Sequence, residues 1–279
     1  MAMDGSDGPH KVAVGAMVRF AYRSVFGRLE LVLELGWIML LALLATLILP
    51  NVLLPDRVAA EGWHLDALDG GEAVIALLSL SAFAVRWHQS ILLGDPRRLS
   101  PRVFFRAWLR FLAYGCAIYL VIGAIAGIAL LGLTRLGASD ATQALVGLAA
   151  IMLGILVALG TLRCGMIFPA AARGRPIGLV TAWRLLRGNS WRFALASMVT
   201  ALPVTAMTAV LTAIVIAVAL PEGAELVTTP PLGFAILTGL IEAVSDILLV
   251  ALGATLLSGF YRELVARRDD GSVEQPTQR

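Results

Sequence analysis

The stretch that decides the fold is LGFAILTGLIEAVSDILLVALGATLLSGF, residues Leu232–Phe260, which carries only two charged side chains, Glu242 and Asp246. A helix crosses a bilayer core of about 30 Å with about 20 apolar residues, so this stretch predicts a membrane-spanning helix. A carboxylate near the bilayer centre is unfavourable by roughly 2.5 to 3.5 kcal/mol on insertion scales. We therefore expect both carboxylates to face the interior of a helix bundle.

The composition places the rest of the chain in the same class. Of the 279 residues, 59% are hydrophobic and 15% are charged, and the mean hydropathy is +0.85. These values are typical of membrane proteins. We expect an all-α, polytopic bundle of six transmembrane helices. The six apolar stretches run over residues 31–50, 73–93, 111–133, 144–163, 191–220 and 232–260.

The basic residues are distributed unevenly between the two sets of loops. Of the 22 Lys and Arg residues, 20 flank one set, and only Arg57 and Arg135 lie on the other side. Because Lys and Arg near short loops stay on the cytoplasmic side, both termini are expected to be cytoplasmic. This predicts a cytoplasmic amphipathic segment over residues 1–28, a six-helix domain over 29–262 and a disordered cytoplasmic tail over 263–279.

Three cytoplasmic segments share an alanine followed by an aromatic residue, a few turns before an apolar stretch. The pairs are Ala21-Tyr22, Ala107-Trp108 and Ala182-Trp183. This spacing favours three repeats, each an amphipathic interfacial helix followed by a helical hairpin.

The middle segment, residues 100–111, has the clearest pattern. Ser100-Pro101 predicts a helix start, and arginines then recur every four residues on one face. Aromatic residues form a second face, which is typical of a helix that lies in the headgroup plane. The predicted lipid- or partner-facing residues are Arg102, Arg106, Arg110, Trp108, Arg184 and Arg187. The alternative is that these arginines only set the topology.

Polar residues inside the apolar stretches predict an intramembrane cluster. Its members are Arg86, His88, Glu242, Ser245 and Asp246. Counting about 1.5 Å per residue from the outer ends of the second and sixth stretches places Arg86 and Asp246 at the same depth, roughly 21 Å. A buried Arg86–Asp246 pair is therefore one interpretation, and a proton or ion path through Glu242 and Asp246 is the other.

The sequence contains no recognisable reaction centre. A nucleotide-binding GxxxxGK[ST], a zinc-binding HExxH and a nucleophile-bearing GxSxG are all missing from the sequence. The three histidines are scattered, and no spaced Cys/His set predicts a metal site. We therefore expect no enzyme, no cofactor and no metal. The bilayer itself accounts for the basic balance, so no nucleic acid is expected as a partner.

Three tracts carry a resemblance to a known group of proteins. They are RWHQSILLG at Arg86–Gly94, AWRLLRGNSWR at Ala182–Arg192 and Phe260-Tyr261-Arg262. In these tracts the chain resembles a largely uncharacterised family of bacterial six-helix inner-membrane proteins. It is also distantly similar to the membrane domain attached to some glycerophosphodiester phosphodiesterases. The resemblance implies a location in the bacterial inner membrane, and it transfers no catalytic residue.

Two functions from different classes follow from the sequence. The first is a non-enzymatic membrane scaffold, which binds anionic lipids, a protein partner or a second copy of the chain through a basic cytoplasmic face. The second is a small transporter or channel-like subunit, with a polar path through Glu242 and Asp246. In the first function the intramembrane charges are sealed inside the protein, and in the second they are accessible to water.

Overall fold

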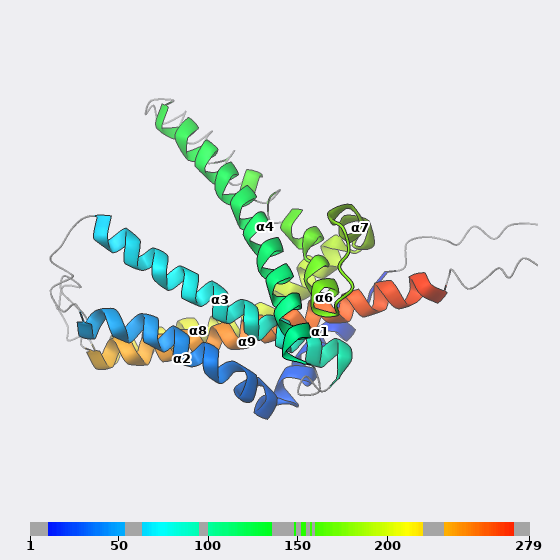
Figure 1. The fold of residues 1–279 in the computed structure, drawn as a ribbon. Helices are drawn as coiled ribbons and strands as arrows, with labels where there is room; N and C mark the ends of the chain where they lie inside the picture. Colours follow the sequence, from blue (N-terminus) through cyan, green and yellow to red (C-terminus); the bar gives the residue numbers. More distant parts are fainter. Residues whose placement is uncertain are drawn as a thin grey trace, which may run out of the picture.

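A computed structural model describes residues 11–53, 63–94, 100–135, 148, 152–154, 157, 160–219 and 232–270. Within these ranges the chain forms helices and turns, and no strand. Five of the helices contain segments long and apolar enough to cross a membrane, as in a multi-pass membrane protein. Figure 1 shows their arrangement.

The first two helices are α1 (Val14–Phe26) and α2 (Leu29–Leu53). In α1 the buried residues Met17, Ala21 and Val25 recur every four positions and form one face, while the basic residues Arg19 and Arg23 are exposed. This periodicity makes α1 the amphipathic helix expected near the N-terminus. The apolar part of α2 then provides the first candidate span, residues 29–46.

The middle of the chain contains α3 (Trp63–Leu93), α4 (Pro101–Arg135), α6 (Ile167–Ala172) and α7 (Leu179–Leu185). α4 contacts α3 and α6, and Figure 1 shows its far end leaving the bundle at an angle. The predicted fourth span, residues 144–163, lies mostly outside the described residues. The expected total of six spans therefore stays a prediction.

The last two helices are α8 (Ser190–Ala219) and α9 (Leu232–Asp270). α9 is the central element, since it contacts α1, α2, α3, α6 and α8. In Figure 1 it runs through the molecule with α2 and α8 alongside. It packs closely on α1 at a glycine, since a Cβ at Gly259 would lie 3.2 Å from side-chain atoms of both Met17 and Phe20.

Two helices continue beyond the predicted boundaries. Residues 101–111 were expected to form a separate interfacial helix, but they are the first turns of α4. No proline or glycine separates the two parts, and extending a helix is easier than starting a new one. Likewise α9 continues to Asp270, into the segment expected to be a disordered tail, of which residues 271–279 lie outside the described part.

The alanines of the three Ala-aromatic pairs occupy similar environments, whereas Trp183 is more exposed than Tyr22 and Trp108. Ala21, Ala107 and Ala182 are all buried, at 0 to 2% exposure. The neighbouring Tyr22 donates a 2.9 Å hydrogen bond to the carbonyl of Thr200, and burial raises the pKa of its phenol. Common burial is compatible with the proposed repeat, which remains a prediction.

Residues near the start of α8 hold the N-terminal segment against the bundle. Asn189 is buried, and its side-chain oxygen accepts a 2.9 Å hydrogen bond from the backbone N–H of Val12. Arg192 donates to the carbonyl of the same residue, also at 2.9 Å. Both backbone groups of Val12 are thereby satisfied, so residues 11–13, the described residues before α1, are anchored to the bundle.

Candidate functional site

The polar tract near the end of α3 is the most buried polar feature of the described chain. Trp87 and Gln89 are 0% exposed and His88 is 1% exposed. Buried polar groups in a membrane-spanning helix are stable only when they find partners inside the protein. The contacts of this tract therefore define the candidate site.

Two side chains of the tract bind α9. The indole Nε1–H of Trp87 donates a 2.8 Å hydrogen bond to the hydroxyl of Thr255, which itself donates to the carbonyl of Ala251. His88 Nδ1 lies 2.8 Å from the hydroxyl of Ser258. Thr255 and Ser258 are both fully buried, so the two bonds fix the rotation of α3 against α9.

The next side chain in the tract binds α6. Gln89 donates a 3.2 Å hydrogen bond from Nε2 to the carbonyl of Ala172, the last residue of that short helix. Its Oε1 atom is buried without a hydrogen-bond partner in the described part of the chain. Ser90 closes the tract by donating to the carbonyl of Trp87 within α3. The tract thus ties three helices together.

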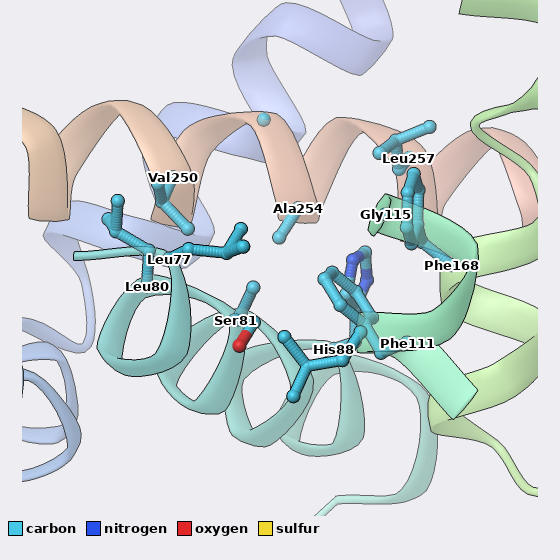
Figure 2. Close-up of a pocket in the computed structure, with 13 residues that line it drawn as sticks. Leu77, Leu80, Ser81, His88, Phe111, Gly115, Phe168, Val250, Ala254 and Leu257 are labelled. Atoms are coloured by element: carbon cyan, nitrogen blue, oxygen red, sulfur yellow. The ribbon is translucent and has the colours of Figure 1, made fainter. Parts of the chain in front are cut away.

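A cavity of about 410 Å³ lies beside this tract, between α3, α4, α6 and α9. Figure 2 shows its lining, with Leu77 and Leu80 toward one end and the ring of His88 toward the other, close to Phe111 and Phe168. The lining is almost entirely apolar.

Two glycines confirm that this space is open. A Cβ added at Gly115 on α4 would meet no atom within 4 Å, even though Gly115 itself is buried. The same holds for Gly253 on α9. The structure therefore contains a preformed apolar site with one histidine at its edge.

The predicted intramembrane cluster is distributed over several places. Ser245 forms a 2.5 Å hydrogen bond with Thr208, which joins α9 to α8. Glu242 and Asp246 are exposed on α9, against the expectation that both face the bundle interior. His88 binds Ser258, which lies 12 positions beyond Asp246, about 18 Å along the helix. The structure does not join His88 to either carboxylate.

The predicted Arg86–Asp246 pair stays a prediction, since the structure shows a different contact of Arg86. Its guanidinium lies over the ring of Phe104, 4.1 Å from the centroid. Equal depth in the bilayer was the basis of that prediction. Depth does not determine rotation, and the face of α3 that carries Arg86 is directed toward α4.

The predicted basic surface is present on α4 and α7. Arg102, Arg106 and Arg110, which we call the arginine row, are all exposed. Trp108 lies on another face of the same helix and donates a 2.8 Å hydrogen bond to the hydroxyl of Ser81 on α3. On α7 and the turn that follows it, Arg184 and Arg187 are exposed as well.

Sequence reasoning missed Thr255 and Ser258, which form the hydrogen bonds to Trp87 and His88. Both are single small polar residues in an apolar stretch, where they are compatible with ordinary helix packing. One signal was available, since adjacent hydrogen-bonding residues on α3, Trp87 and His88, require two partners on a neighbouring helix.

Among the described residues no group of three or more His, Cys, Asp or Glu side chains is arranged to hold a metal ion. The resemblance to bacterial six-helix membrane proteins remains a prediction from the sequence. Comparison of the chain with protein-family models, with curated proteins and with solved structures finds no match.

Proposed function

We propose that the protein is a non-enzymatic scaffold component of the bacterial inner membrane, and that its basic cytoplasmic face binds anionic lipid headgroups. The arginine row carries this proposal. Both termini and the start of α4 are cytoplasmic in this arrangement, on the side where 20 of the 22 basic residues lie.

The geometry of α4 supports a binding role for the arginine row. Ala107 is buried and Trp108 is hydrogen-bonded to α3, so these residues hold one side of the helix against the bundle. The opposite side presents three exposed guanidinium groups at successive turns. Each Arg near an anionic bilayer surface contributes about 1 kcal/mol of attraction, so three in a row favour an anionic lipid layer over a neutral one.

A second candidate function, an ion or proton path, rests on Glu242 and Asp246. Both are exposed in the middle of α9 and therefore open to a ligand or to a second chain. Asp246→Asn would test this path in proteoliposomes. A pH-dependent flux that disappears in the variant, with unchanged thermal stability, supports it.

The arginine row is tested with the full-length protein in detergent and an equimolar mixture of phosphatidylglycerol and phosphatidylcholine. Native mass spectrometry then reports which lipid stays bound. We expect the wild-type protein to retain mainly phosphatidylglycerol, and the double variant Arg106→Gln/Arg110→Gln to lose most of this preference. The preference of both proteins should weaken as the salt concentration rises.

Arg173→Gln/Arg175→Gln is the matched control. It removes the same charge from two exposed arginines that follow α6 and are not part of α4. If both double variants lost the same amount of lipid preference, the preference would depend only on the total charge of the protein. That result would contradict a specific role for the arginine row.

A further inference from the structure

The cavity beside His88 is elongated along the helices. Its lining residues on α3 extend from Leu77 to His88, which corresponds to about 16 Å of helix. On α9 they extend from Val250 to Leu257. The cavity therefore runs parallel to two apolar helices, in the direction that lipid chains take in a bilayer.

Among the described residues that line the cavity, two are polar, Ser81 and His88. The Ser81 hydroxyl is already used, since it accepts from Trp108 and donates to the carbonyl of Leu78. The ring of His88 has one hydrogen bond, between Nδ1 and Ser258. Its Nε2 atom has no partner among the described residues, although the side chain is 1% exposed.

His88 also lies near one end of α3. It lies five positions before Leu93, the last residue of α3, which is about 7.5 Å of helix. The apolar span of α3 ends at Leu93, so the His88 end of the cavity is the end nearer to the headgroup region. Lipid ester groups lie between the hydrocarbon core and the headgroups.

We propose that this cavity binds one acyl chain of a membrane glycerolipid, with the ester carbonyl oxygen of the chain accepting a hydrogen bond from His88 Nε2–H. In this arrangement Nδ1 accepts the 2.8 Å hydrogen bond from the Ser258 hydroxyl, and the proton of the neutral ring is on Nε2. The apolar lining, from Leu77 to Ala84 on α3 and from Val250 to Leu257 on α9, surrounds the chain. This site recognises chain and ester rather than headgroup charge, so it goes beyond the proposed function of the arginine row.

The test uses the full-length protein in bilayers of phosphatidylcholine that carries a photoactivatable diazirine on one acyl chain. After irradiation, peptide mass spectrometry locates the labelled residues. We expect residues 77–84 and 250–257 to be labelled at least fivefold more than the exposed face of α8 around Leu202 and Leu211. Phosphatidylcholine has no net charge, so replacing the arginines of the arginine row should leave the labelling of the cavity residues unchanged.

Three variants make the test specific. Gly253→Leu places a side chain in the cavity and should reduce the labelling of residues 77–84 at least fivefold. Gly123→Leu is the matched control, since an added Cβ there also meets no atom within 4 Å but lies outside the cavity, and it should label like the wild type. His88→Gln keeps an N–H donor near the Nε2 position and should retain more label than His88→Leu.

Thermal unfolding in detergent identifies any variant that fails to fold. Two outcomes would overturn the proposal. One is labelling spread evenly over the exposed faces of the helices and unaffected by Gly253→Leu, which means ordinary bilayer contact. The other is a cross-link between two protein chains through the cavity residues, which means that a second copy fills the space.

Discussion

The indole of Trp87 donates a 2.8 Å hydrogen bond to the hydroxyl of Thr255, and both residues are fully buried between α3 and α9. The two positions are 168 residues apart in the chain. One turn further along α9, Ser258 forms a second hydrogen bond of the same length, with the ring of His88. α1 and α6 also contact α9.

Replacing Thr255 with Val should destabilise the protein while preserving the shape of the side chain. The Trp87 N–H would be left buried without an acceptor, and we expect a loss of about 1 kcal/mol in the free energy of unfolding. Thermal unfolding in detergent measures this loss. Thr205→Val is the control, because the hydroxyl of Thr205 is exposed and bonds only to its own helix. Equal losses in both variants would show that the α3–α9 bond contributes nothing.

Replacing Gly259 with Leu should separate α1 from α9. A Cβ there would already crowd the sulfur of Met17 and the ring of Phe20, so a larger side chain must displace α1. Overpacking of this kind costs about 1 to 3 kcal/mol. We expect a lower melting temperature and faster proteolytic cleavage within α1, whereas Gly123→Leu should show neither. Unchanged cleavage of α1 would contradict the close packing.

The phenol of Tyr22 should make stability depend on alkaline pH. Burial raises its pKa in the folded state, so the folded protein holds this proton more tightly than the unfolded chain does. Its contribution to stability is therefore constant below about pH 10, the ordinary tyrosine pKa, and falls as the pH rises above that value. Comparing melting temperatures of the wild type and Tyr22→Phe between pH 8 and 11 isolates this contribution. If the two proteins lose stability in parallel, the phenol is not responsible.

The distribution of basic residues predicts the orientation of the chain. Single cysteines would be placed at positions 66, 225 and 270 of a variant in which Cys116 and Cys164 are replaced. In intact cells an impermeant thiol reagent should label positions 66 and 225 only. Position 270 should become reactive once the membrane is opened. Labelling of position 270 in intact cells would reverse the topology and remove the cytoplasmic location of the arginine row.

The apolar helices were predictable because their signal is local. Residues 191–220 were expected to be helical and α8 covers Ser190–Ala219, while α9 begins at Leu232 as expected. The length and apolarity of a segment determine whether it can cross a bilayer, and both are read from consecutive residues. The basic, exposed character of the arginine row was also local, since it follows from a spacing of four in a helix.

The sequence by itself determined that the described residues are helical, that several helices are long and apolar enough to cross a membrane, and that a polar tract lies near the end of α3. Only the tertiary structure decided which partners the tract has. Successive residues of a helix point about 100° apart, so Trp87 and His88 reach α9 while Arg86 turns to Phe104. The rotation and register of α3 against α9 depend on every contact between them, and no stretch of consecutive residues specifies them.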